Sequence, residues 1–209
     1  EQMGLQVLVD RGRELEQRPP DRRADQLGLV GGAQREQVLA GGNGRRGLAP
    51  RRVLHAALAA RLPPLNIFRM LPHAPTFVRG FGQLGTAILS QAALDARLRE
   101  LIILRVGRRS PAPYEWQQHV PIGRACGVSD DDIAALERDD VKAACFGERD
   151  RVVLQLTDEL LAAPRASDET LAAMRRQFSD REVCEAVFTV GFYMMVARFL
   201  ETTGVDLES

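Results

Sequence analysis

A glutamate and a histidine stand four positions apart in the stretch PYEWQQH, residues 113–119. If this stretch is helical, Glu115 and His119 lie on one face about one turn apart, where the carboxylate can orient the imidazole and stabilise its charged form. Such a pair can transfer protons near neutral pH. The same spacing also occurs in exposed ion pairs worth about 0.3 kcal/mol, so a polar surface stripe is the structural alternative.

A second carboxylate lies inside an apolar stretch. Glu100 belongs to LRELIILRV, residues 98–106. Because its neighbours are apolar, its side chain must either emerge at an edge or be buried with a partner. A partly buried carboxylate can hold or pass a proton near neutral pH. The structural alternative is a salt bridge from Glu100 to Arg97, Arg105 or another helix.

These residues need helices to position them, and the sequence marks where the helices begin and end. Asp95 can cap a helix whose apolar residues point to several sides, which predicts the central helix of a bundle. Pro113 suits the first position of the next helix, and Gly127 suits the left-handed position that follows its end. Serines at N-cap positions mark three further starts: Ser129, Ser167 and Ser179.

The fold class follows from these patterns. Because no stretch alternates as a strand does, the sequence predicts an all-α domain of about seven helices between residue 53 and about residue 203. Residues 61–75, RLPPLNIFRMLPHAP, read as a proline-broken connection. Residues 1–50 lack aromatic residues and a sustained apolar period, which predicts an irregular or disordered N-terminal extension. The helical domain is assigned to residues 51–209.

Composition narrows the classes of partner. The 209 residues include 28 basic and 28 acidic side chains, so no net field favours nucleic acid or an anionic membrane. The longest apolar run, around Val187 to Ala197, falls short of the ~18 residues expected of a membrane span. The first residues lack a basic stretch followed by an apolar one, as a signal peptide would have. We therefore expect a cytoplasmic protein that contacts neither nucleic acid nor membrane.

The three cysteines do not form a motif. Cys126, Cys145 and Cys184 are far apart and include no C-x-x-C, so neither a disulfide framework nor a zinc ribbon is predicted. Each is expected to be a small buried apolar residue.

Residues 94–136, LDARLRELIILRVGRRSPAPYEWQQHVPIGRACGVSDDDIAAL, closely resemble the carboxymuconolactone decarboxylase family, which also contains the alkylhydroperoxidase AhpD-like proteins. The R-x-R-E-L-x-x-L helix, the Y-E-W-x-x-H helix and the G-V-S turn match in order and spacing. PPLNIFRMLPHAP and GFYMMVARFL extend the resemblance to roughly residues 60–207. It implies an AhpD-like helical bundle that assembles as a trimer or hexamer, with the final helix, Val183 to Leu200, contributing to burial.

The resemblance also shows what this chain lacks. Peroxidase members of the family carry a glutamate followed twelve residues later by a cysteine, three later by a second cysteine and four later by a histidine. Counted from Glu100, these positions hold Ala112, Glu115 and His119. Without a thiolate there is neither a nucleophile for a peroxide nor a resolving partner, so thiol-dependent peroxidase activity is not expected.

A member without thiols is similar to the decarboxylase branch, whose reaction removes CO2 from a carboxylated lactone without a cofactor. The resemblance implies that His119 protonates the developing carbanion or dienolate, that Glu115 sets its tautomer and charge, and that Glu100 completes the relay. Arg97 could bind a substrate carboxylate in two-point fashion. Tyr114 and Trp116 are adjacent and cannot share a face, so one is expected to pack inward and the other to line a pocket or an interface.

Several functions stay open on this basis. The leading hypothesis is a cofactor-free lyase or isomerase acting on a small lactone or carboxylic acid. A metal site formed by Glu115, His119 and Glu100, with His73 as a further ligand, is one alternative. The others are a non-catalytic oligomer that binds a small molecule, and an AhpD-like antioxidant protein without the usual thiol pair.

Overall fold

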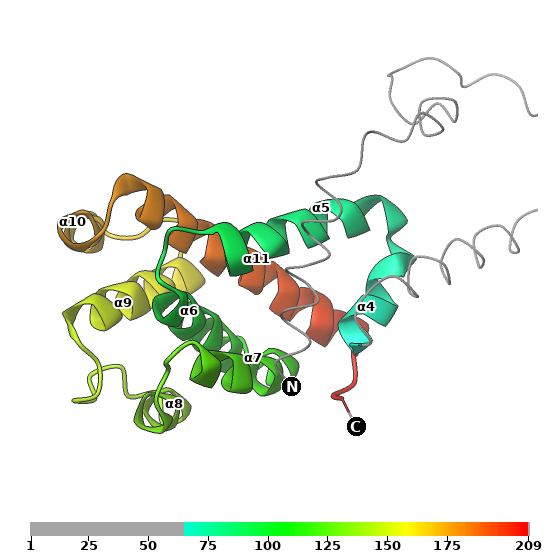
Figure 1. Cartoon of the computed structure of the whole chain (residues 1–209), viewed down its shortest axis with the longest axis horizontal. Coiled ribbons are helices and arrows are strands. Elements are labelled where there is room, and N and C mark those ends of the chain that lie inside the picture. Colours follow the sequence, from blue (N-terminus) through cyan, green and yellow to red (C-terminus); the bar gives the residue numbers. More distant parts are fainter. Residues whose placement is uncertain (1–64, 209) are drawn as a thin grey trace, which may run out of the picture.

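The computed structural model describes residues 65–208, which form a bundle of helices (Figure 1). Within these residues there are eight α-helices and no strand. The α-helices are α4 (Asn66–Met70), α5 (Pro75–Thr86), α6 (Ala96–Arg109), α7 (Pro113–Ala125), α8 (Asp130–Glu137), α9 (Glu148–Ala162), α10 (Asp168–Gln177) and α11 (Asp180–Thr203). The predicted all-α class is confirmed, whereas the predicted N-terminal extension, residues 1–50, and the start of the helical pattern at Val53 lie outside the described residues.

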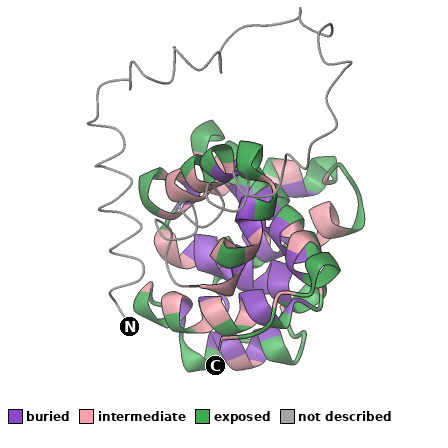
Figure 2. Cartoon of the chain, turned by 90° about the vertical axis from the view of Figure 1, so that its right-hand side faces the viewer, coloured by how far each residue is buried: buried purple, intermediate pink, exposed green. Residues whose placement is uncertain are grey.

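Helix α6 is the centre of the bundle, as its apolar sequence predicts. Every residue from Leu98 to Gly107 is buried, because α7, α8, α9 and α11 surround the helix. In Figure 2 the buried residues of the described domain, in purple, gather in its interior. The long helix α11 packs along α6 and α9 and closes the core on another side. A polar side chain that points inward from α6 must therefore find its partner on one of these helices.

The predicted helix boundaries are confirmed by their hydrogen bonds. The Asp95 carboxylate accepts from the N–H groups of Arg97 and Leu98 at the start of α6. Gly127 has φ +95°, the left-handed conformation expected after α7. Serine hydroxyls accept backbone N–H groups at the starts of three helices, namely Ser129 in α8, Ser167 in α10 and Ser179 in α11.

The connection predicted for residues 61–75 contains more helix than its prolines suggest. Residue 65 onward forms α4 and a 3-10 turn, Leu71–His73, before α5 begins at Pro75. The prolines occupy early positions of these elements, where a missing N–H costs nothing, so they start helices as well as interrupting them. A short π-helical segment, η2 (Ala87–Gln91), continues α5.

The cysteines differ from the expectation of buried apolar residues. Cys126 is half-buried, and Cys145 and Cys184 are exposed. The helical spacing of α11 places Cys184 on its outer side, which the apolar neighbours of this residue in the sequence do not reveal.

Helix α11 is also longer and more apolar than the short run at Val187 to Ala197 suggests. Its 24 residues make it the one helix among the described residues that could cross a membrane by length and composition. Half of its most apolar 18-residue window is buried inside the domain. The core helix of a helical bundle can meet the same criteria of length and composition.

Candidate active site

A buried carboxylate and an imidazole meet between α6 and α7. Glu100 is fully buried, and its Oε2 lies 2.9 Å from Nδ1 of His119, which is 8% exposed. The two residues come from neighbouring helices, because α6 and α7 pack against each other along much of their length. Of the two alternatives left open for Glu100, the structure shows the buried one, and its partners are His119 and Arg99, not Arg97 or Arg105.

This contact decides which nitrogen of His119 is available for chemistry. An ionised carboxylate only accepts hydrogen bonds, so Nδ1 carries a proton and donates it to Glu100. In the neutral ring Nε2 is then the unprotonated nitrogen that can take a proton. Glu100 also stabilises the imidazolium that forms when Nε2 is protonated, as a buried carboxylate does in other acid–base sites.

Arg99 completes the charge balance around Glu100. Its Nε donates to Oε1 of Glu100 at 3.2 Å, and both residues are buried. Nη2 of Arg99 also contacts Sγ of Cys126 at 3.7 Å. Burial and the negative charge of Glu100 raise the pKa of the Cys126 thiol, so this thiol stays protonated and is a poor nucleophile.

Glu115 does not orient His119, contrary to the prediction from their spacing. Its side chain is buried, with only 2% of the residue exposed, and neither carboxyl oxygen has a hydrogen-bond partner among the described residues. The hydrogen bond that orients the imidazole comes from Glu100, at Nδ1. Burial and the nearby carboxylate of Glu201 raise the pKa of Glu115 to about 9, so this side chain is neutral at pH 7.

A tyrosine on α11 packs against the imidazole of His119. The rings of His119 and Tyr193 are 5.0 Å apart and nearly perpendicular, which is a favourable edge contact. Tyr193 packs in the same way on Phe192, whose ring contacts Phe81 of α5. The sequence analysis missed Tyr193 as a site residue, because in GFYMMVARFL it is one apolar position among many.

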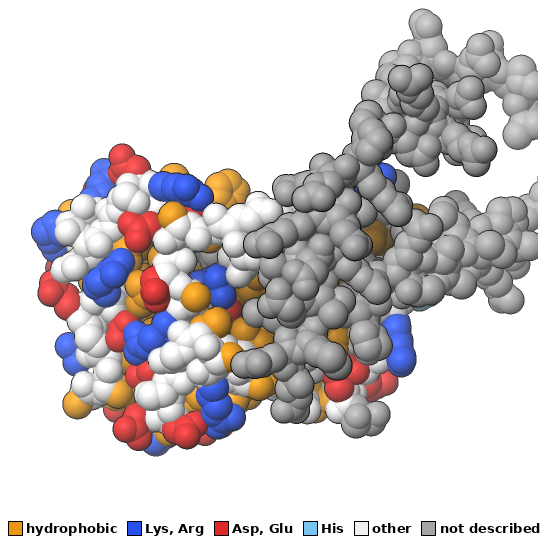
Figure 3. Space-filling view, viewed as in Figure 1, with side chains coloured by type: hydrophobic (Ala, Val, Ile, Leu, Met, Phe, Trp, Pro, Cys, Tyr) orange, Lys and Arg blue, Asp and Glu red, His pale blue; other side chains and the backbone are white. Residues whose placement is uncertain are grey.

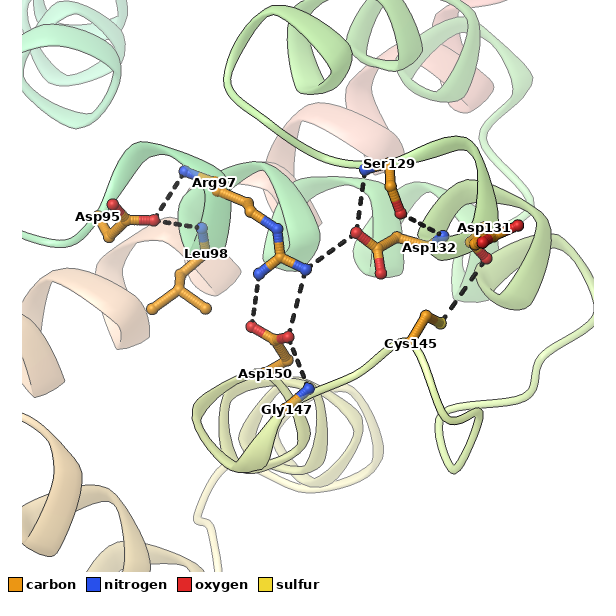
Figure 4. Close-up of polar contacts among 9 residues, drawn as sticks. All are labelled: Asp95, Arg97, Leu98, Ser129, Asp131, Asp132, Cys145, Gly147 and Asp150. Carbon is orange, nitrogen blue, oxygen red and sulfur yellow. Dashed lines mark hydrogen bonds and ion pairs between the residues drawn. The ribbon is translucent and has the colours of Figure 1, made fainter.

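The sequence analysis predicts that Arg97 binds a substrate carboxylate. In the structure its guanidinium instead binds carboxylates of the protein and joins helices. Its Nη1 and Nη2 bind the two oxygens of Asp150 at 2.7 and 3.2 Å, and Nη2 also binds Asp132 at 2.9 Å (Figure 4). These ion pairs tie the start of α6 to α8 and α9. They raise the pKa of Arg97 further. The N–H of Ser129 and the guanidinium of Arg97 together keep the pKa of Asp132 below its ordinary range.

The adjacent aromatic residues divide as expected, and the structure identifies which one is inside. Tyr114 is buried, and its hydroxyl donates to Glu208 at 2.6 Å and accepts the N–H of Ile67 at 3.3 Å. It therefore fastens α4 and the C-terminal segment to α7. Trp116 is half-buried and packs against the edge of the core. The predicted role of Tyr114 and Trp116 in substrate binding stays a prediction.

A surface cavity lies between the C-terminal ends of α6, α9 and α11. It has a volume of about 400 Å³, and its wall includes Arg109, Ser110, Ala197 and Glu201. Glu201 is the carboxylate that acts on Glu115, and Ala197 lies one helical turn from Tyr193. The described residues contain no group of three or more histidine, cysteine, aspartate or glutamate side chains that could hold a metal ion.

The fold and the site together define an all-α bundle whose central helix supplies a buried carboxylate to a histidine on the next helix. Residues 75–159 match the carboxymuconolactone decarboxylase family, and this segment contains Glu100, Glu115 and His119. This segment of the chain is therefore similar to that family, and it lacks the C-x-x-C thiols of the peroxidase members. No curated protein sequence matches the chain.

Solved structures share this fold at low sequence identity. A protein from Agrobacterium tumefaciens, described as a putative antioxidant defence protein AhpD, has 21% identity and a TM-score of 0.60, covering 67% of this chain and 96% of its own. An uncharacterised peroxidase-related protein with an alkylhydroperoxidase AhpD core, from Ralstonia eutropha JMP134, has 20% identity and a TM-score of 0.63, with coverage of 76% and 84%. The debrominase Bmp8 in complex with 2,3,4-tribromopyrrole has 16% identity and a TM-score of 0.61, with coverage of 77% and 85%. At these identities the likeness concerns the fold alone.

Proposed function

We propose that this protein is a cofactor-free lyase or isomerase that moves a proton on a small lactone or carboxylic acid, with His119 as the acid and base. The buried contact between Glu100 and His119 carries the proposal. It fixes the tautomer of the imidazole and leaves Nε2 to exchange a proton with a substrate carbon. The match of residues 75–159 to the carboxymuconolactone decarboxylase family supports decarboxylation as the leading reaction.

The electron and proton flow of that reaction is simple. The carbon–carbon bond to the carboxylate breaks, CO2 leaves, and the electron pair stays on the substrate as a dienolate. Protonated Nε2 of His119 then gives its proton to the substrate carbon and recovers one from solvent. In an isomerisation the same atom would remove a proton from one carbon and return it to another. Glu100 stabilises the imidazolium form in both cases.

The test measures how three proteins act on a panel of carboxylated lactones and small carbon acids in D2O. CO2 release and deuterium incorporation are followed by NMR for wild type, His119→Ala and His73→Ala. His73 is an exposed histidine in the 3-10 turn, so it is the matched control. We expect turnover of at least one compound by wild type and His73→Ala, and none by His119→Ala. Turnover that survives in a folded His119→Ala protein contradicts the proposal.

A thiol-dependent antioxidant function is less well supported. Ala112 and Glu115 occupy the positions of the two family cysteines, and the thiol of Cys126 is kept protonated by its surroundings. Catalysis that needs a thiolate has no suitable group in this part of the domain.

We also propose that the protein is a homo-oligomer, a trimer or hexamer, located in the cytoplasm. Large apolar side chains remain exposed on two helices, with Phe77 on α5 71% exposed and Phe188 on α11 63% exposed. Elsewhere, on the face shown in Figure 3, acidic and basic side chains are interspersed, so it offers no extended patch of one sign to a nucleic acid. Light scattering of wild type and Phe188→Glu tests the assembly. A monomeric wild type, or an unchanged assembly of the variant, contradicts this use of α11.

A further inference from the structure

The carboxyl group of Glu115 lies near the site but forms no hydrogen bond with the described residues around it. Both oxygens of Glu100 are bonded, one to His119 and the other to Arg99. Glu115 is equally enclosed, yet neither of its oxygens has a partner among the described residues. Buried polar groups in folded proteins are almost always hydrogen-bonded. An unpaired carboxyl group next to a candidate site therefore needs an explanation, and a role in the chemistry of the site is one.

The protonation state of Glu115 limits what that function can be. A general base or a nucleophile has to be ionised, and an ionised carboxylate buried without a cation or donor is strongly disfavoured. Glu201 adds a second negative charge nearby, which further disfavours the ionised form of Glu115. The side chain is therefore a neutral acid, and a neutral acid has one O–H to donate.

The position of Glu115 gives this O–H a target. Glu115 and His119 are four residues apart on α7, so their Cβ atoms are about 5–6 Å apart on one face of the helix. A strip of α11 faces both residues, because Tyr193 contacts His119 and Glu201, two turns further on, acts on Glu115. A molecule whose carbon meets Nε2 of His119 can thus place an oxygen at Glu115.

We propose that Glu115 donates a hydrogen bond to the oxygen on which negative charge develops when His119 and its substrate exchange a proton or lose CO2. This inference rests on the proposed function and deepens it, because it names the substrate class: carbonyl compounds that react through an enolate or dienolate. The electron pair left by the broken C–H or C–C bond is delocalised onto the carbonyl oxygen. Glu115 keeps its proton throughout, and the proton that returns to carbon comes from His119.

The physical advantage is that the donor is oriented before the charge appears. Donors fixed in a water-poor site stabilise a developing oxyanion more than they stabilise the neutral carbonyl, which lowers the barrier. A carboxylic acid held neutral by apolar surroundings is a known form of such a donor. A cavity of about 400 Å³ lies against Ala197 and Glu201 on α11, and its wall includes neither Glu115 nor His119.

The experiment uses 4-nitrophenol, whose phenolate carries an oxyanion on a small planar ring and changes absorbance on binding. Dissociation constants are measured at pH 7 for wild type, Glu115→Gln, Glu115→Leu and His119→Ala. A glutamine amide still donates an N–H, whereas leucine fills the space without a donor. We expect wild type and Glu115→Gln to bind within about threefold of each other, and Glu115→Leu to bind at least about tenfold more weakly.

Several results would overturn the assignment. These are absence of binding to wild type, equal binding by a folded Glu115→Leu protein, or a loss in Glu115→Gln as large as in the leucine variant. Because the leucine variant can fail to fold, carboxyl ¹³C shifts of labelled wild-type protein give a second measurement. They should show Glu115 protonated at pH 7, and an ionised Glu115 refutes the proposal. Phenol binding that depends on residue 115, without turnover of any carbon acid, would retain this donor and reject the proposed reaction.

Discussion

Glu100 and His119 form a buried hydrogen bond of 2.9 Å between two helices, although eighteen residues separate them in the chain. The contact gives α6 a charged group at its centre that is balanced by Arg99 on one side and by the imidazole on the other. Because each member is enclosed, a change at any of them has consequences for both stability and chemistry.

Replacing Glu100 by glutamine should destabilise the domain. The substitution keeps the volume of the side chain but leaves the buried guanidinium of Arg99 without its neighbouring carboxylate. We expect the free energy of unfolding in urea to fall by about 3 kcal/mol. Glu137→Gln, at an exposed position on α8, is the control and should change it by less than about 0.5 kcal/mol. Equal stability of the two variants would show that the buried pair is not strongly coupled to folding.

The stability of wild type relative to Glu115→Gln should depend on pH. The pKa of Glu115 is about 9 in the folded protein and near 4.5 in the unfolded chain, so folding takes up a proton between these values. Wild type therefore loses stability as pH rises through this window, by at most about 1.4 kcal/mol per pH unit, while the glutamine variant does not lose this part.

Urea unfolding at pH 5, 7 and 9 measures this difference. The advantage of Glu115→Gln over wild type should be smallest at pH 5 and largest at pH 9. Glu201→Gln removes the nearby negative charge and should reduce the loss in wild type at high pH. A stability difference that is constant with pH would mean that Glu115 is ionised in the folded protein.

Arg97→Ala should affect folding and leave ligand binding unchanged. The substitution leaves the buried carboxylates of Asp132 and Asp150 without their shared cation. Since Arg97 is partly exposed, we expect a loss of about 2 kcal/mol in the free energy of unfolding. Arg175→Ala, at an exposed position on α10, is the control. A normal stability combined with weaker binding of carboxylated compounds would restore the substrate-binding role predicted from the sequence.

The hydroxyl of Tyr114 should be energetically coupled to Glu208. Tyr114→Phe removes the donor to Glu208 and the acceptor of the Ile67 N–H, at an expected cost of about 1–2 kcal/mol. In a double-mutant cycle with Glu208→Ala the two costs should not add, because both substitutions break the same contact. Additive effects would show that the C-terminal segment and Tyr114 stabilise the domain independently.

The cysteines should react with a thiol reagent at different rates in the native protein. Cys145 and Cys184 are exposed, whereas Cys126 is half-buried and its pKa is raised by burial and by Glu100. We expect two thiols to react quickly and the thiol of Cys126 slowly, with all three reacting quickly in denaturant. Cys126→Ser should remove the slow phase alone, and loss of a fast phase instead would contradict the assignment.

The sequence was sufficient to predict the features that depend on local chemistry. Capping side chains at Asp95, Ser129 and Ser179 mark helix starts, because a polar side chain next to an apolar period satisfies the free N–H groups of the first turn. The apolar residues on all sides of Glu100 require burial of that helix, and the spacing from Glu100 to His119 indicates the family. The positions held by Ala112 and Glu115 likewise exclude a C-x-x-C pair without any structure.

Tertiary packing decided which of these groups meet. Spacing along α7 predicts that Glu115 orients His119, but the packing of α6 on α7 brings Glu100 to Nδ1 and leaves Glu115 enclosed without a partner. Arg97 binds Asp132 and Asp150 for the same reason, since its partners come from helices that only the fold places beside it. Periodicity tells which face of a helix is buried, whereas the partner of a buried polar group depends on the rotation and register of the neighbouring helix, which no local pattern contains.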